Sequence, residues 1–211
     1  RAALARGVCR ALLTLTGAGP VVTGPARAVA QRVVVANHAS YLDGLILRAA
    51  LPGRLFFVAK RELARWRIVG LFLERIGVEF VERDDHRQGL ADLERIRERA
   101  AAGETVVAFP EGLLADGAGL RAFRVGAFMI AVQAGIEVVP VAIRGSRALL
   151  RCSARVPRPA RVHVVVGEPI APQGGDWNAA LALRDRARGF VLEHCGEPDL
   201  APGGPTVVGN L

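Results

Sequence analysis

The sequence predicts an α/β domain in which a mainly parallel central sheet is covered by helices. Short runs rich in valine, isoleucine and phenylalanine alternate along the chain with longer segments whose apolar residues recur at helical spacing. Most of the short runs are apolar throughout, as expected of strands that are buried on both faces. At 211 residues, of which 51% are hydrophobic, the chain is long enough to bury one sizeable core.

The N-terminal segment, residues 1–30, is expected to form an amphipathic helix over 1–17 followed by a loop. Its apolar side chains fall on one face, and its arginines lie elsewhere: Leu4, Val8, Ala11, Leu12 and Leu15 against Arg1, Arg6 and Arg10. This pattern fits a helix that lies on a membrane surface. It fits a helix that packs on the protein's own core equally well.

The main domain is expected to span 31–197, with strands and helices in alternation. Strands are predicted at 32–36, 55–59, 78–81, 105–109, 138–143 and 162–166. Helices are predicted at 42–49, 62–75, 87–102, 124–134 and 177–194. Gly103 and Gly135 stand where two of these helices should end. The remaining residues, 198–211, are rich in proline and glycine and are expected to form a loose tail.

Four polar residues stand at or just after the ends of predicted strands: His38, Lys60, Arg83 and Glu111. In a parallel sheet the carboxyl ends of the strands lie at one edge, and ligands gather beyond that edge. The sequence therefore predicts that these four side chains contribute to one site.

The segment Asn-His-Ala-Ser-Tyr-Leu-Asp-Gly at 37–44 contains the strongest candidate for chemistry. His38 has the side chain best suited to act as a base near neutral pH, and Asp43 could hold its ring in one tautomer. No serine nucleophile is needed if the substrate supplies a hydroxyl that His38 deprotonates. Alternatively, Ser40 and Asp43 have the spacing of a helix capping box, so Asp43 could serve only to cap a helix.

Composition argues against several other functions. The net charge of +8 is carried almost wholly by scattered arginines, without the basic run of a nucleic-acid-binding tract, so no nucleic-acid partner is expected. Three distant cysteines and four dispersed histidines predict no metal site. Glycine-rich nucleotide motifs are absent, and no cofactor is expected. The basic surface would attract anionic lipid headgroups or an acidic acyl carrier.

Four landmarks then occur in order: NHASYLD at 37–43, VEFVER at 78–83, FPEG at 109–112 and VVPVAI at 138–143. FRVGAF at 123–128 follows the third of them. Together they resemble the lysophospholipid (1-acylglycerol-3-phosphate) acyltransferase family from about Val33 to Ile170. The resemblance implies a fold like that of glycerolipid acyltransferases. It also implies transfer of a fatty acyl group from acyl-CoA or acyl carrier protein to the hydroxyl of a lysophospholipid, in phospholipid biosynthesis or remodelling.

The resemblance also implies roles for individual residues. His38 is the catalytic base and Asp43 its partner. Arg83, Glu111 and Gly112 match residues linked to acceptor binding, and Lys60 is a looser match. Such an enzyme is expected to be peripheral on the cytoplasmic face of the cell membrane.

One departure from the family pattern concerns the acceptor. The family usually continues FPEG with Thr-Arg-Ser, whereas this chain has Leu113-Leu114-Ala115. The missing arginine could have held a phosphate through a charge-assisted hydrogen bond. Two alternatives therefore stay open: an acyltransferase for a non-phosphate acceptor of the ornithine-lipid type, and a lipid-binding module without catalysis.

Overall fold

The structure, a computed structural model, describes residues 2–60, 78–81, 98–99, 103–151, 153–154 and 156–201. The expected helix at 62–75, most of the one at 87–102, and the candidate site residue Arg83 lie outside these residues. The side chains of 58–60 and 78–81 are also outside the description.

The described elements follow the predicted alternation closely. The strands are β1 (Val21–Thr23), β2 (Val33–Ala36), β3 (Leu55–Lys60), β4 (Val78–Val81), β5 (Thr105–Ala108), β6 (Val138–Arg144) and β7 (His163–Val166). The helices are α1 (Ala2–Leu15), the short 3-10 helix η1 (Ala26–Val29), α2 (Asp43–Ala50), α5 (Gly126–Ala134), α6 (Ser146–Leu149) and α7 (Trp177–Cys195).

The described strands form one seven-stranded sheet in the order β1-β7-β6-β2-β5-β3-β4. β6, β2, β5, β3 and β4 are parallel to one another, and only the pairing of β6 with β7 is antiparallel. The predicted α/β class with a mainly parallel sheet is therefore confirmed. β2 and β5 are neighbours, which places the segments that follow them, at 37–42 and 109–112, side by side.

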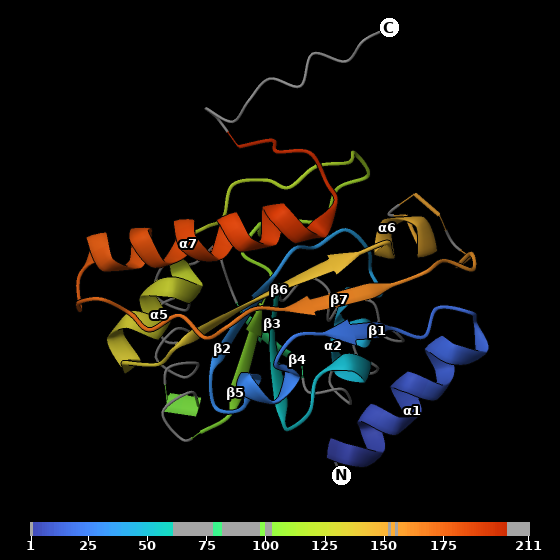
Figure 1. Ribbon diagram of the computed structural model, residues 1–211, viewed down its shortest axis with the longest axis horizontal. Helices are drawn as coiled ribbons and strands as arrows, with labels where there is room; N and C mark the ends of the chain where they lie inside the picture. The colour runs from blue at the N-terminus through green and yellow to red at the C-terminus, as the bar shows by residue number, and fades with distance from the viewer. Residues whose placement is uncertain are drawn as a thin grey trace, which may run out of the picture.

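Each face of the sheet is covered by its own hydrophobic cluster. Val34, Ala36 and Val107 face a cluster that includes residues of α1 and α2. Val33, Val35 and Val106 face the opposite cluster, which includes residues of α5 and α7. Figure 1 shows α7 lying along one side of the sheet while α1 and α2 lie on the other. Two-sided burial explains why β2 and β5 have only apolar and small side chains along most of their length.

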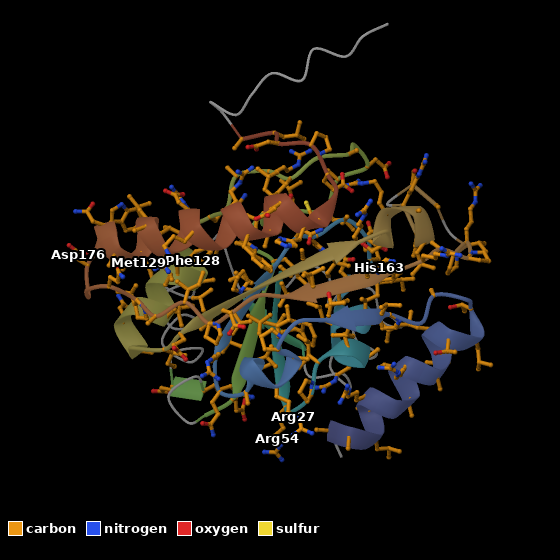
Figure 2. The ribbon with its side chains drawn as sticks, in the orientation of Figure 1. Arg27, Arg54, Phe128, Met129, His163 and Asp176 are labelled. Carbon is orange, nitrogen blue, oxygen red and sulfur yellow. The ribbon has the colours of Figure 1, made fainter. Side chains whose placement is uncertain are left out.

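The helix α7 begins with a side-chain cap. Asp176 accepts a hydrogen bond from the backbone N–H of Ala179 at 2.8 Å, which satisfies one of the free donors at the helix start. Figure 2 shows Asp176 at that end of α7 and Phe128 and Met129 on the neighbouring α5. Phe128 is fully buried in the cluster between these helices and the sheet.

The N-terminal segment is more closely joined to the main domain than the predicted boundary at residue 30 implies. The expected loop contains β1, which extends the sheet by pairing with β7. Cys9 and Leu13 of α1 are buried in the same cluster as α2. Arg6 donates hydrogen bonds to the carbonyl oxygens of Ala49 and Ala50 at the C-terminal end of α2. Residues 2–30 therefore share the core of the domain.

The start of the expected loose tail is held in place. The N–H of Leu120 donates to the carbonyl of Pro198 at 2.8 Å, and the N–H of Leu200 donates to the carbonyl of Leu120 at 3.0 Å. Residues 198–200 thus form a short parallel pairing with a distant loop, which the proline and glycine content did not indicate. Residues 202–211 lie outside the description.

Candidate active site

Asn37 closes the end of β2 and directs the chain out of the sheet. Its side-chain amide donates to the carbonyl of Ile143 at 2.9 Å, and its side-chain oxygen accepts from the N–H of Ile143 at 2.7 Å. This reciprocal pair replaces the next step of the β2–β6 ladder with a side chain. Both backbone groups of Ile143 stay satisfied while the main chain turns away, and His38 is the first residue beyond the turn.

His38 and Asp43 are in contact. Nδ1 of His38 lies 2.9 Å from Oδ2 of Asp43. The Asp43 side chain is fully buried, whereas the His38 side chain is partly exposed. A carboxylate at Nδ1 favours the tautomer that carries its proton on that nitrogen, which leaves Nε2 able to accept a proton. The ring also stacks on Phe109 with a centroid distance of 4.2 Å, which restricts its rotation.

Asp43 also organises the backbone of its own loop. Its Oδ2 accepts hydrogen bonds from the N–H groups of Ala39 and Ser40, at 2.7 and 2.8 Å. The bond from Ser40 is one half of the capping box that the sequence suggested. The other half is missing, because Ser40 Oγ accepts from Leu42. The two interpretations of Asp43 are thus compatible: one carboxylate oxygen holds the loop and contacts the imidazole.

Glu111 joins the first loop to the second. Its Oε1 accepts the backbone N–H of His38 at 2.7 Å, and its Oε2 accepts the backbone N–H of Arg121 at 3.0 Å. Only 6% of Glu111 is exposed. Burial raises the pKa of this carboxyl, and the two N–H donors and His38 oppose the rise. Glu111 is therefore a buried structural bridge at His38, which is a different role from direct contact with the acceptor.

Gly112 has a backbone conformation that favours glycine, with φ of +76°. A Cβ atom added there would lie 2.5 Å from Nε of Arg124, so the Arg124 side chain lies directly across this glycine. Arg124 is held beside the loop by its N–H, which donates to the carbonyl of Pro110 at 2.8 Å. Its side chain is exposed. The structure thus adds a cation at FPEG that the sequence did not single out.

Lys60 ends β3 at the same edge of the sheet, in register with Val81 of β4. Since β5 separates β3 from β2, and neighbouring strands lie about 4.8 Å apart, the backbone of Lys60 is roughly 10 Å from that of His38 along the sheet. The side chain of Lys60 and the whole of Arg83 lie outside the described residues. Of the predicted site residues, the structure therefore brings together His38, Asp43, Glu111 and Gly112.

Arg121 and Phe109 are parts of this site that sequence reasoning missed. Arg121 contributes its backbone N–H, a group that every residue except proline has, so no residue type could indicate it. Phe109 belongs to the FPEG landmark, and an aromatic residue directly before a turn was the one available signal. Its stacking on His38 depends on the adjacency of β2 and β5.

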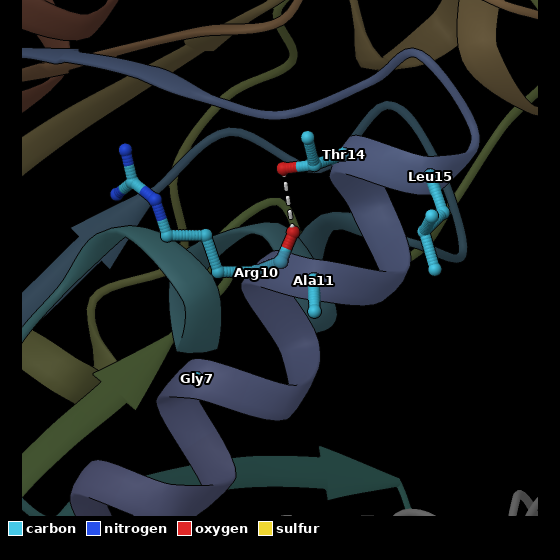
Figure 3. Close-up of a pocket in the computed structure, with 5 residues that line it drawn as sticks. All are labelled: Gly7, Arg10, Ala11, Thr14 and Leu15. Atoms are coloured by element: carbon cyan, nitrogen blue, oxygen red, sulfur yellow. Dashed lines mark hydrogen bonds between the residues drawn. The ribbon is translucent and has the colours of Figure 1, made fainter.

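A surface hollow of about 490 Å³ lies elsewhere, on α1, lined by Gly7, Arg10, Ala11, Thr14 and Leu15 (Figure 3). Thr14 Oγ1 donates to the carbonyl of Arg10 at 2.8 Å beside it. Because α1 packs against the C-terminal end of α2, whereas Asp43 is at the N-terminal end, the hollow is not part of the His38 site.

Comparison with known proteins agrees with this geometry. Residues 21–144 match the family model described as Acyltransferase. The chain is 34% identical over 158 residues to the lyso-ornithine lipid O-acyltransferase of Pseudomonas aeruginosa, which is 67% of this chain and 60% of that protein. It is 31% identical over 161 residues to the human 1-acyl-sn-glycerol-3-phosphate acyltransferase alpha, which is 76% of this chain and 57% of that protein.

A solved structure has the same fold. It is the 1-acyl-sn-glycerophosphate acyltransferase PlsC of Thermotoga maritima, with a TM-score of 0.75 and 24% sequence identity, covering 91% of this chain and 78% of that one. The chain spans about 60% of the length of the sequence relatives it matches.

Proposed function

We propose that this chain, which belongs to the acyltransferase family, transfers a fatty acyl group from a thioester to the free hydroxyl of a lysophospholipid such as 1-acylglycerol-3-phosphate. The observation that carries the proposal is the contact of 2.9 Å between His38 Nδ1 and Asp43 Oδ2 at the carboxyl end of β2. The thioester donor is acyl-CoA or acyl carrier protein. The names of the relatives support this reaction class and a role in phospholipid biosynthesis or remodelling.

His38 acts as the base in this reaction. Its Nε2 removes the proton of the acceptor hydroxyl as the oxygen attacks the thioester carbonyl carbon. A new ester bond forms, the carbon–sulfur bond breaks, and the thiolate takes the proton back from His38. Asp43 stabilises the imidazolium that exists between the two proton transfers. The acceptor supplies the nucleophile, so the chain needs no serine or cysteine at this position.

Recognition of the acceptor headgroup falls to cations around the loop. Arg83 and Lys60 remain the residues proposed from the sequence, with Glu111 acting through its bridge to His38. Arg124 adds an exposed guanidinium at Gly112, and an arginine can hold a phosphate through two parallel hydrogen bonds. Losing one such contact costs about 1.5–3 kcal/mol, so Arg83→Lys and Arg124→Gln should each raise the acceptor KM about tenfold or more.

The experiment that tests the function is a transfer assay with radiolabelled acyl-CoA and acyl carrier protein against a panel of lysolipids. The wild-type protein should form the diacyl product with at least one phosphate-bearing acceptor. His38→Ala should reduce turnover by about 10²- to 10⁴-fold while the protein stays folded by circular dichroism. Product at the wild-type rate in the His38→Ala variant would reject the base. Lipid binding without product from either donor would favour a non-catalytic lipid-binding module.

A second acceptor class has specific support. The similarity to the lyso-ornithine lipid O-acyltransferase is as strong as to the phosphate-directed relatives. The chain also has Leu113-Leu114 after FPEG, with Leu113 exposed, in place of an arginine. The same panel separates the classes, because a lyso-ornithine lipid offers a carboxylate and an amine but no phosphate. Preference for it over lysophosphatidic acid would assign the chain to the second class.

We further propose that the protein is peripheral on the cytoplasmic face of the cell membrane, with α1 as its contact surface. Among the described helices none is long and apolar enough to cross a bilayer. In α1, Leu4 and Leu15 are 73% and 85% exposed, and Val8 and Leu12 are also exposed on that face. The opposite face packs on α2. This arrangement supports the membrane interpretation of the amphipathic pattern, and the exposed Arg10 adds attraction to anionic lipid.

Vesicle sedimentation tests this location. Deleting 1–17 should release the protein from phosphatidylglycerol vesicles, but it also removes Cys9 and Leu13 from the core. The sharper variant is Leu4→Ser with Leu15→Ser, which should weaken binding about tenfold or more because each buried leucine contributes about 1.5–3 kcal/mol. Val156→Ser is the matched control, since Val156 is 72% exposed and lies away from α1. Equal binding by all three proteins would place the contact surface elsewhere.

A further inference from the structure

The C-terminal segment Glu197–Leu200, called the strap below, holds the loop that follows FPEG. Its backbone pairs with Leu120 through the two hydrogen bonds described above. Its first residue adds a side-chain anchor, because Glu197 Oε2 accepts the N–H of Gly119 at 2.6 Å and Oε1 pairs with Arg147 at 2.8 Å. Arg147 in turn donates to the carbonyl of Ala115 at 2.8 Å. The loop is thus tied to the strap at several points.

Arg188 of α7 binds the loop and the strap together. Its Nη2 donates to the carbonyl of Leu120 at 3.0 Å, and its Nε donates to the carbonyl of Arg121 at 3.1 Å. The same guanidinium forms an ion pair with Asp199. Both partners of that ion pair are mostly buried, so the interaction is less screened than a surface pair. A single planar side chain therefore sets the position of two successive loop residues relative to the strap.

The position of Arg121 matters to the reaction site because its N–H holds Glu111. The contacts form a continuous series from Arg188 to the Arg121 backbone, from the Arg121 N–H to Glu111 Oε2, and from Glu111 Oε1 to the His38 N–H. Glu111 is buried and can exchange neither donor for bulk water without cost. A shift of Arg121 is therefore transmitted to the residue that carries the base.

We propose that Arg188 is a positioning residue for His38, acting through the strap-bound loop and Glu111. The inference rests on the proposed acyl transfer for its kinetic consequence, but the contacts themselves do not depend on the acceptor. Removing the guanidinium should let the loop shift, weaken the Arg121–Glu111 hydrogen bond and displace the His38 backbone. A small displacement of a catalytic group lowers turnover more than it lowers ground-state binding.

The first test is kinetic. Arg188→Gln should lower kcat about tenfold and leave the donor KM within about twofold, because one charge-assisted contact is lost outside the donor site. Arg184→Gln is the matched control: Arg184 lies one turn earlier on α7 and pairs with the exposed Asp185. A kcat for Arg188→Gln equal to that of Arg184→Gln would overturn the proposal.

A double-mutant cycle separates positioning from general destabilisation. If Arg188 acts through Glu111, then Glu111→Gln combined with Arg188→Gln should have about the kcat of Glu111→Gln alone. Effects that multiply would mean that Arg188 acts independently of Glu111, against the proposal. If Arg188→Gln does not fold, Asp199→Asn replaces it in the cycle, because that variant keeps both carbonyl contacts of Arg188. Its smaller loss of kcat should likewise vanish in the Glu111→Gln background.

Hydrogen exchange gives a readout that needs no substrate. Arg188→Gln should speed exchange in peptides that contain the N–H groups of Arg121 and of His38, and Arg184→Gln should change neither. Faster exchange at Arg121 with no change at His38 would refute the transmission through Glu111. A wild-type protein that acylates no acceptor would reject the proposed function alone, because this exchange experiment decides the positioning role separately.

Discussion

The two loops that form the candidate site are held in different ways. The first, 37–43, is stabilised mainly from within: Asp43 accepts from Ala39 and Ser40 and contacts His38, all within five residues. The second, 109–121, depends on distant partners, including His38, Arg147, Arg188 and the strap. The base and its orienting carboxylate are therefore encoded locally, whereas the bridge that fixes the base relative to the sheet edge is assembled from remote parts of the chain.

This difference predicts how the loops should fail. A change within the first loop alters the chemistry directly and should act on turnover. A change in the second should act on the position of Glu111 and on the surface that faces the acceptor, with smaller effects spread over kcat, the acceptor KM and stability. Each variant below tests one side of this comparison.

The largest effect is expected in the first loop, from Asp43→Asn. An amide oxygen can still accept from Ala39 and Ser40, so the helix start and the loop should persist. The neutral amide no longer stabilises an imidazolium, and it permits the wrong tautomer of His38. We expect kcat to fall by about 10²-fold or more with little change in thermal stability. A variant that loses stability and activity together would show that Asp43 serves mainly as a cap.

An intermediate effect is expected in the second loop, from Gly112→Ala. The positive φ costs an alanine about 1–2 kcal/mol, and the new methyl group would displace the Arg124 side chain. We expect a lower melting temperature and an acceptor KM raised about tenfold. Gly117→Ala in the same loop is the control, because Gly117 has open space around it and no positive φ. Equal behaviour of the two variants would mean that the Arg124 contact is not used.

The smallest effects are expected in the pH dependence of stability, where two carboxyls of the second loop and its strap act with opposite signs. Burial raises the pKa of Glu111, so the folded protein binds this proton more tightly than the unfolded chain. The resulting stabilisation is present at low pH and is lost as the pH rises from the ordinary glutamate range through the raised pKa. The hydrogen bond from Arg188 lowers the pKa of Asp199. That stabilisation is present above the ordinary aspartate range and is lost as the pH falls.

Urea unfolding between pH 3 and 8 measures both contributions. Glu111→Gln should remove the decline of stability above the ordinary glutamate range, and Asp199→Asn should destabilise the protein at pH 7 but have little effect at the acid end. Glu168→Gln, at an exposed position, is the control. A Glu111→Gln profile parallel to that of the wild type would show that Glu111 does not titrate in this range.

Much of the fold could be predicted from the sequence because its signals are local. The apolar runs of β2 and β5 and the helical spacing of α7 reflect which side chains each element must bury. The pairing of His38 with Asp43 could be predicted for the same reason, since a separation of five residues at the start of a helix permits few geometries. The short strand β1 was missed, because three residues between glycines and prolines give too little periodicity.

Tertiary structure alone decided what those local elements face. The adjacency of β2 and β5 follows from strand order, and it places Phe109 on the His38 ring and Glu111 beneath its N–H. The strap depends on a pairing 78 residues apart between Gly119 and Glu197, and proline- and glycine-rich composition pointed instead to a loose tail. The sequence by itself determined the residues that can move a proton. Only the packing of distant segments determined how they are held, because backbone N–H and carbonyl groups make those contacts and are identical in almost every residue.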